Sequence, residues 1–300
     1  MGVRILSLVT AIALTLSLRA QTESDVRMSE GGYGLVRTNI SVAYDHAWGD
    51  VLDSFNARVS YEFVSKRFLT LSANFKHNSV NTDFGRDDLG EAYDPEAIGL
   101  NDTQTMQQIG LTATAGARLA GRPVRVLALL NSEWGKGGFN RVTATLTGLI
   151  MVRATRSTQF GVGVLGMINT TSKVPVFPVF VYRHRFNDRW AVNLYGAMMG
   201  FDFTPTRTDM VSVGADINVK SFYFRPHAVG LPSTCRYTQT DFRPMLKYRR
   251  RLMHCLYLDA MAGYAVNMKT RVNGVNGTKE YITISRRPAP FVQASVSYSL

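Results

Sequence analysis

The sequence has few of the features that hold together a small exported domain or a helical membrane protein. It contains only two cysteines in 300 residues, Cys235 and Cys255, too few for a disulfide-stapled scaffold. Beyond its first twenty residues it has no uncharged run of about 18 residues or more, which excludes helical membrane spans. The Lys/Glu/Leu-rich periodicity of a helix bundle is also missing.

The first twenty residues are different and predict a cleavable secretory signal. Arg4 supplies a positive start, Ile5–Leu18 is uncharged and mostly apolar, and Ala20 is a small residue suited to precede a cut. We expect cleavage after Ala20, with residues 21–33 forming a periplasmic N-terminal segment. No cysteine follows the cleavage site directly, so a lipoprotein anchor is not expected.

The charge balance is strongly basic. The formal net charge is +12, and loss of Arg4 and Arg19 with the signal leaves +10. Basic chains commonly bind nucleic acid or anionic membrane surfaces, but no nucleic-acid module is present and the chain is exported. A cavity that attracts anions, or contact with anionic lipid head groups, fits an exported chain better. A generally basic surface is the plainer interpretation.

Polar and apolar residues alternate along segments of about ten residues, as in transmembrane strands. In 36–44 and 55–63 the aliphatic and aromatic residues occupy every second position, and 69–75, 141–152, 209–219 and 289–300 repeat the pattern. Side chains alternate across a strand, so each segment would present one apolar and one polar face. Segments near 124–131 and 222–226 are too irregular to assign.

The connections between these segments alternate between short and long. Tight turns are predicted at Ser65–Arg67, Leu119–Pro123, Ala154–Ser157, Asn187–Asp188 and Arg249–Arg251. Longer links are predicted at 78–104, 131–140, 169–175, 201–208, 226–238 and 268–279. Short periplasmic turns and longer external loops are typical of outer-membrane β-barrels. We therefore predict an all-β, antiparallel barrel over residues 34–300 with about 14 strands, 12 being the nearest alternative. A soluble sandwich or lipocalin-like barrel fits less well.

The C-terminal strand resembles the recognition signal of Gram-negative outer-membrane barrels, with Val296, Tyr298 and Leu300 in the matching positions. The stretch "VPVFPVFVYRHRFNDRWAVNLYGAMM" is similar to families of uncharacterised outer-membrane barrels. The resemblance implies location in the outer membrane, contact with its lipid, and insertion by the barrel assembly machinery. It implies no assigned activity, and the oligomeric state stays open.

Charges on the face opposite the aliphatic residues are mostly basic. We expect these residues to line the lumen, since a charge facing the lipid midplane costs about 2–4 kcal/mol: Arg37, Arg58, Lys76, Arg183, Arg185, Arg243 and Lys247. Such a lumen favours anions and predicts a passive, porin-like channel for small solutes. The alternative is a plugged structural or partner-docking barrel in which these cations pair with carboxylates.

One pair of residues raises the question of catalysis. "FKHNSV" places His77 and Ser79 on the lipid-facing side of a strand, which resembles the outer-membrane phospholipase A family. That resemblance implies Ser79 as nucleophile and His77 as its base. However, Val80-Asn81 stands where the family has Asn-Gly, and a second motif of the family is absent. We therefore expect no enzymatic activity.

The remaining features predict no cofactor and no metal. Loop 78–104 concentrates seven carboxylates without the ligand spacing of an EF-hand, and we expect a solvated loop that can fold against the basic lumen. Cys235 is expected in an external loop and Cys255 at the periplasmic end. A full strand separates them, far beyond the distance that a disulfide spans.

Overall fold

The structure is a computed structural model that describes residues 38–48, 52–66, 68–85, 94–96, 98–136, 138–168, 176–194, 198–227, 230–275, 279–284 and 286–299. The predicted signal peptide, the segment 21–33 and the barrel residues 34–37 lie outside these ranges. Within the described residues there is no helix long and apolar enough to cross a membrane.

The chain forms fifteen strand segments. They are β1 (Thr38–Ala47), β2 (Leu52–Lys66), β3 (Leu69–Thr82), β4 (Thr103–Leu119), β5 (Arg122–Gly135), β6 (Gly138–Ala154), β7 (Thr158–Ile168), β8 (Val176–Arg185), β9 (Trp190–Asn193), β10 (Met199–Phe203), β11 (Asp209–Phe224), β12 (Cys235–Arg251), β13 (Leu256–Gly274), β14 (Glu280–Ile284) and β15 (Ala289–Ser299).

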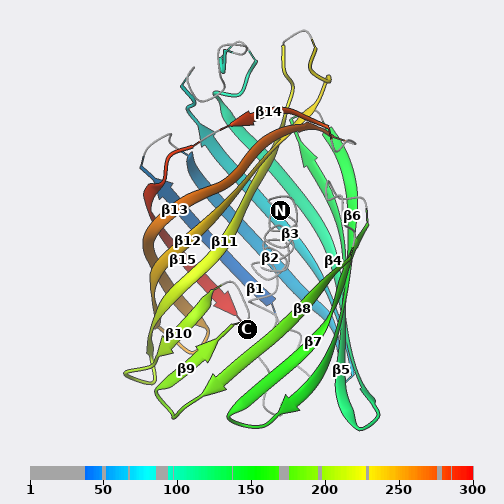
Figure 1. The fold of residues 1–300 in the computed structure, drawn as a ribbon, viewed down its shortest axis with the longest axis vertical. Coiled ribbons are helices and arrows are strands. Elements are labelled where there is room, and N and C mark those ends of the chain that lie inside the picture. Colours follow the sequence, from blue (N-terminus) through cyan, green and yellow to red (C-terminus); the bar gives the residue numbers. More distant parts are fainter. Residues whose placement is uncertain are drawn as a thin grey trace, which may run out of the picture.

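The strands close into one antiparallel barrel (Figure 1). β14 and β15 both pair with β13, so together they form one interrupted strand and the barrel has 14 strands. β15 also pairs with β1, for example Val296 with Val42, which closes the ring. This confirms the predicted fold class and strand number. Closure satisfies the backbone groups that an open sheet edge would leave exposed to lipid.

The two ends of the barrel differ in their connections, as Figure 1 shows. We call one end the turn end, because short turns join β2 to β3, β4 to β5 and β6 to β7 there, and the other the loop end. At the β4–β5 turn, Ala120 and Gly121 have positive φ angles of 48° and 77°. The longest described connection is at the loop end, between Thr82 and Thr103, so the loop predicted at 78–104 is shorter at both of its ends.

Several connections correct the predictions. Residues 131–140 are not a long link, because β5 and β6 extend through them to a tight hairpin. The link at 201–208 lies at the turn end instead of the external side. The turn predicted at Arg249–Arg251 lies at 252–255, because β12 continues to Arg251 and pairs there with Tyr257. Sequence alternation alone does not fix where a strand ends.

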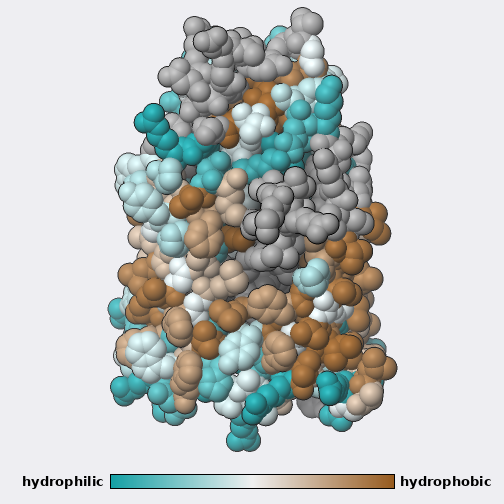
Figure 2. All heavy atoms as spheres, viewed as in Figure 1, coloured by the Kyte–Doolittle hydropathy of each residue, from teal (hydrophilic) through white to brown (hydrophobic). Residues whose placement is uncertain are grey.

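The outer surface carries the aliphatic and aromatic residues of the alternating pattern. Ile109, Leu146 and Val213 are each more than half exposed. On the face shown in Figure 2, hydrophobic residues lie across the middle and lower part of the barrel, with hydrophilic residues at its turn end and above them. A closed barrel with an apolar belt is the architecture that spans an outer membrane.

The β9–β10 hairpin is much shorter than its neighbours, and it leaves two strand edges without a neighbour among the described residues. β8 pairs with β9 only at Arg183–Arg185, and β11 pairs with β10 only up to Ala215. Tyr182 still accepts a backbone hydrogen bond from Leu194, so the stretches without a strand partner among the described residues are 176–181 of β8 and 216–224 of β11 on the sides that face β9 and β10. β9 ends at Asn193, and the chain returns as β10 from Met199.

Candidate functional site

The interior of the barrel carries a dense set of charges, and the densest group lies on β1, β11 and β12. Arg243 donates two hydrogen bonds to the carboxylate of Asp216, at 2.9 and 2.7 Å, and its guanidinium lies 3.7 Å from Asp45. Lys220 Nζ lies 2.5 Å from the other oxygen of Asp45. We call Asp45, Asp216, Lys220 and Arg243 the arginine–aspartate cluster. Its charges pair because each is withdrawn from bulk water.

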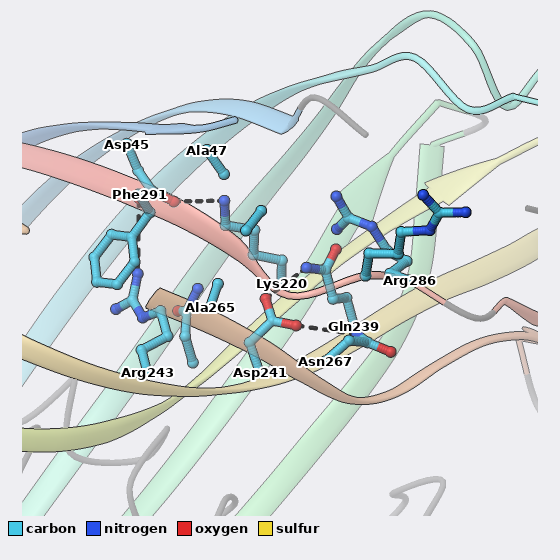
Figure 3. A pocket seen from close by; sticks show the side chains of 13 residues that line it. Asp45, Ala47, Lys220, Gln239, Asp241, Arg243, Ala265, Asn267, Arg286 and Phe291 are labelled. Atoms are coloured by element: carbon cyan, nitrogen blue, oxygen red, sulfur yellow. Dashed lines mark hydrogen bonds and ion pairs between the residues drawn. The ribbon is translucent and has the colours of Figure 1, made fainter. Parts of the chain in front are cut away.

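A polar cavity lies beside this cluster (Figure 3). It contains about 400 Å³ of empty space, including the part that opens to solvent. Asp241 accepts hydrogen bonds from Gln239 and from Asn267, the latter at 3.0 Å, and Arg286 also lines the cavity. Phe291 forms an apolar wall, with the Arg243 guanidinium 4.6 Å from its ring centroid. The cavity therefore offers both donors and acceptors to a small polar solute.

A second group of charges crosses the opposite wall in register. The pairing places five inward-facing residues at one level across five adjacent strands, which we call the polar row: Arg58, Lys76, Gln108, Glu133 and Arg141. Arg58 and Lys76 face each other directly, and like charges in that position repel. The row is thus an electropositive strip with one carboxylate in it.

The side chains from β11 and β12 reach this row across the lumen. Tyr223 donates a hydrogen bond to Glu133. Arg141 Nε lies 3.4 Å from Glu133 Oε2, and Arg236 Nη2 lies 4.0 Å from the same oxygen. The loop-end half of β11 contacts β4 and β5 because the short β9–β10 hairpin leaves it free to lean inward. Two cations and a hydroxyl therefore converge on one buried carboxylate.

An apolar cluster fills the lumen at the loop end. It joins buried residues from β3, β11–β14 and the β3–β4 loop, which we call the mouth cluster: Val80, Phe84, Ile98, Leu100, Phe222, Phe224, Cys235, Tyr237, Val272, Ile282 and Ile284. Phe222 stacks on Tyr237 with ring centroids 4.5 Å apart. β3 and β11 are nearly half the ring apart, so the cluster bridges opposite walls.

The described residues of the β3–β4 loop fold inward through apolar side chains. Its residues Phe84, Ile98 and Leu100 enter the mouth cluster, whereas Asp83, Glu96 and Asp102 are exposed. Asp102 pairs with Lys136 on the β5–β6 turn. Burial of apolar surface therefore holds the described part of this loop in the lumen. Of the seven carboxylates predicted in the loop, those at 87, 88 and 91 lie outside the described residues.

Part of the inner wall formed by β5, β7 and β8 is apolar. Five buried residues line them, which we call the apolar patch: Leu129, Leu165, Met167, Phe177 and Val179. β5 is one of the segments too irregular to assign from sequence. Its inner Leu127 and Leu129 alternate with outer Val126 and Leu130, so both faces are apolar and the polar–apolar alternation disappears.

The predicted lumen-lining cations occupy different places. Arg58, Arg243 and Lys247 are buried, and Lys76 is half-buried in the polar row. Lys247 lies 3.7 Å from Asp259. Arg183 and Arg185 have the same parity as the inward residues of β8 but are exposed near the turn end. Arg37 lies outside the described residues.

Other polar residues that the structure brings to the lumen were not predicted from the sequence. Arg141 and Lys220 have the parity of polar inner-face neighbours, Thr143 and Ser212, so alternation could have identified them. Arg236 and Tyr223 have the opposite parity to the mouth-cluster residues beside them. Their place in the lumen could not be predicted from the sequence, because they reach Glu133 only where β11 leans across the lumen toward β4 and β5.

His77 and Ser79 lie on the outer-face parity of β3, with Phe75. The register places Gln107 opposite His77 and Thr105 opposite Ser79 on β4. The described structure contains no hydrogen bond between His77 and Ser79. Without that contact the histidine is not placed to take the serine proton.

The C-terminal strand closes the barrel, and the two cysteines lie at its two ends. Val296 and Tyr298 point outward on β15, between β1 and β13, and Leu300 lies outside the described residues. Cys235 begins β12 at the loop end and is buried, whereas Cys255 lies in the β12–β13 turn; both are free thiols.

No family model and no curated protein sequence matches this chain. Among solved structures it is similar to an outer-membrane channel described as COG4313 from Pseudomonas putida F1, at 10% identity and a TM-score of 0.45, covering 91% of this chain and 98% of that one. A Pseudomonas aeruginosa FadL homologue aligns at 9% identity and a TM-score of 0.41, covering 88% and 89%. Outer membrane phospholipase A from Escherichia coli aligns at 10% and 0.37, covering 87% and 95%. Similarities this low establish neither a family nor a function.

Proposed function

We propose that this protein is a passive outer-membrane channel for small solutes, with a preference for anions. The observation that supports this most is the electropositive polar row on one wall of the lumen, facing the polar cavity beside the arginine–aspartate cluster. Cations fixed along a pore attract anions and repel cations. The solute is therefore a small, hydrophilic anion or a neutral polar molecule.

The mouth cluster acts as the gate in this proposal. It fills the loop end with aromatic and aliphatic side chains, and the β3–β4 loop contributes Phe84, Ile98 and Leu100 to it. A hydrophobic constriction blocks ions by excluding water. Passage then requires the β3–β4 loop to leave the lumen, so weakening its apolar contacts increases the open fraction.

The test is single-channel recording of the refolded mature protein in a planar bilayer under a KCl gradient. We expect discrete openings, a reversal potential that favours chloride, and more frequent openings for Phe222→Ala. Glu96→Gln is the control, because Glu96 is exposed in the β3–β4 loop and is not part of the mouth cluster. A barrel that inserts correctly and stays silent in all three forms contradicts the proposal.

The second candidate is a closed barrel with a structural or partner-docking role and no transport. The mouth cluster favours it, because its side chains bridge opposite walls and its members are almost fully buried. The ion pairs of Arg243 with Asp216 and of Lys247 with Asp259 favour it as well. Silence of the Phe222→Ala barrel would establish this candidate over the channel.

We propose no enzymatic activity for the pair His77 and Ser79. The pair faces outward, as lipid hydrolysis requires, but lacks the serine–histidine hydrogen bond. Hydrolysis of phospholipid vesicles by the purified barrel, compared with Ser79→Ala, tests this. Lipid hydrolysis that disappears with Ser79→Ala would overturn it.

A further inference from the structure

We propose that the outer surface of β6–β9 binds an anionic phospholipid at the turn end of the barrel. The site combines exposed arginines with aromatic rings, which together we call the aromatic–arginine patch: Arg153, Phe160, Tyr182, Phe186, Arg189 and Trp190. Its ligand is a lipid with a phosphate in the head group, a net negative charge and acyl chains. This inference is independent of the channel, because it concerns the outer surface instead of the lumen.

The turn end exposes an excess of positive charge. Exposed arginines in or beside its tight turns include Arg122, Arg153, Arg156, Arg189, Arg207 and Arg251. None of these six forms an ion pair with another residue that the structure describes. Asp188 is the one carboxylate among the described residues of these turns. The turn end therefore attracts anions.

A β-bulge places Arg153 on the outer surface. The register of β6 and β7 shifts after Met151, and Arg153 then pairs with Phe160. Without the shift Arg153 would share the inward direction of Met151, which is buried. Bulges of this kind redirect a side chain. Here the bulge brings a guanidinium next to an aromatic ring, on the face that also carries the exposed Val162.

Aromatic side chains continue the patch across the neighbouring strands. Phe160 pairs in register with Tyr182 on β8, and their ring centroids are 6.5 Å apart. Trp190 on β9 lies opposite Phe203 on β10, with centroids 4.5 Å apart. Phe186, in the β8–β9 turn, is 60% exposed. Tyrosine and tryptophan rings suit the level where lipid head groups meet acyl chains, because one end of each ring is apolar and the other polar.

The β8–β9 turn holds Arg189 next to these rings. The side-chain oxygen of Asn187 accepts hydrogen bonds from the backbone N–H groups of Arg189 and Trp190, both at 2.9 Å. The carbonyl of Arg189 accepts another from the N–H of Thr204, at 2.8 Å. The backbone is thus fixed while the Arg189 side chain stays exposed. A guanidinium presents planar, paired donors that match the oxygens of a phosphate.

The mixture of charge and apolar surface favours a lipid over an acidic protein as the partner. Hydrophilic residues lie at the turn end, directly beside hydrophobic ones (Figure 2). A phospholipid has the same order of polarity along its length, so its phosphate meets the arginines while its acyl chains lie on the rings and on Val162. An acidic protein would contact the charges alone. Anionic lipids are also attracted by clustered basic residues at a membrane surface.

The test is quenching of Trp190 fluorescence by phospholipids that are brominated on their acyl chains, with the barrel reconstituted in vesicles. The chain has three tryptophans, so Trp48→Phe with Trp134→Phe leaves Trp190 as the only reporter. We expect brominated phosphatidylglycerol to quench Trp190 at a lower mole fraction than brominated phosphatidylcholine. Arg153→Gln and Arg189→Gln should each reduce this preference about fivefold, as for the loss of one cation at an anionic membrane surface.

The matched control is Arg122→Gln, which removes an exposed arginine beside the β4–β5 turn, outside the patch. It should leave the lipid preference at Trp190 unchanged. Heat-modified mobility in gels verifies that each variant is folded. A preference that falls equally in Arg122→Gln and Arg153→Gln overturns the site, because overall charge alone would then explain it. Equal quenching by the two lipids in the parent overturns it as well and would point to an acidic protein.

Thermal unfolding of the unmodified barrel in maltoside micelles is a second readout that needs no tryptophan replacement. A lipid that binds the folded state raises the unfolding midpoint. Phosphatidylglycerol should raise it more than phosphatidylcholine, and Arg153→Gln should remove most of that difference. Glycerol phosphate, which lacks acyl chains, should have no effect. An equal rise with both lipids, or a rise with glycerol phosphate as large as with phosphatidylglycerol, contradicts the proposal.

Discussion

Two groups of inward-facing residues, one on β11–β13 and one on β5, β7 and β8, belong to one closed sheet, yet their chemistry is opposite. The first carries Asp216, Arg243 and Lys247, each paired with an opposite charge. The second carries the apolar patch. The strands between the two groups, β9 and β10, are only four and five residues long. They therefore separate β8 from β11 at the turn end but not at the loop end. Barrel position alone therefore does not determine what an inward residue must be.

The largest effect is expected on the charged side. Arg243→Ala leaves Asp216 and Asp45 buried without their guanidinium partner, which should lower the free energy of unfolding by about 3–5 kcal/mol. Urea unfolding of the refolded barrel measures this. Arg185→Ala, at the exposed turn end, is the control and should change it by less than about 0.5 kcal/mol. Equal changes in both variants would mean that the cluster contributes no more than a surface charge.

The apolar side should respond to lost volume instead of lost charge. Leu165 is 1% exposed, and Leu165→Ala should cost about 2–4 kcal/mol through lost burial and the cavity left behind. Val164→Ala changes the next residue, which faces outward, and should cost less than half as much in the same urea titration. If Val164→Ala proves the more costly, the inner patch is not packed as described.

Gly110 on β4 tests how closely side chains pack on the wall that joins the two groups. A Cβ at this position would lie 2.3 Å from Asn131 Oδ1 and 2.7 Å from Asn74 Oδ1, since both side chains extend over the glycine. Gly110→Ala should therefore destabilise the barrel by about 1–3 kcal/mol. Gly116, on the same strand, has no atom within 4 Å of such a Cβ, so Gly116→Ala should be neutral or stabilising. Adding Asn131→Ala to Gly110→Ala should restore part of the loss.

The smallest effect is expected outside both sides, at the loop end. The hydrogen bond from Lys136 holds the pKa of Asp102 below its ordinary value of 3.8. A lowered pKa in the folded state contributes stability above that ordinary value, which is lost as pH falls through the folded pKa. Both side chains are exposed, so Asp102→Asn should cost well under about 1 kcal/mol. Unfolding titrations at neutral pH and near pH 3 check the sign.

Much of the outer surface could be predicted from the sequence, and much of the interior could not. Ile40, Val42 and Tyr44 alternate with polar residues and do face outward, because lipid constrains every outer position in the same way. Leu129 and Phe177 break the alternation, since the inner faces of β5 and β8 are apolar at these positions as well. The contact of Tyr223 with Glu133 depends on β11 leaning across the lumen, which no local pattern encodes.

The pairing of β1 with β15 has a consequence for how the chain reaches this state. Nearly the whole described chain separates Ile40 from its partner Tyr298, so the contact order is high and loop-closure entropy opposes the last step. Until β15 arrives, β1 and β13 both present open edges that can pair with other chains. A nascent chain lacking β15 would therefore be prone to aggregate. The unpaired edges of β1 and β13 need protection by a chaperone until β15 is in place.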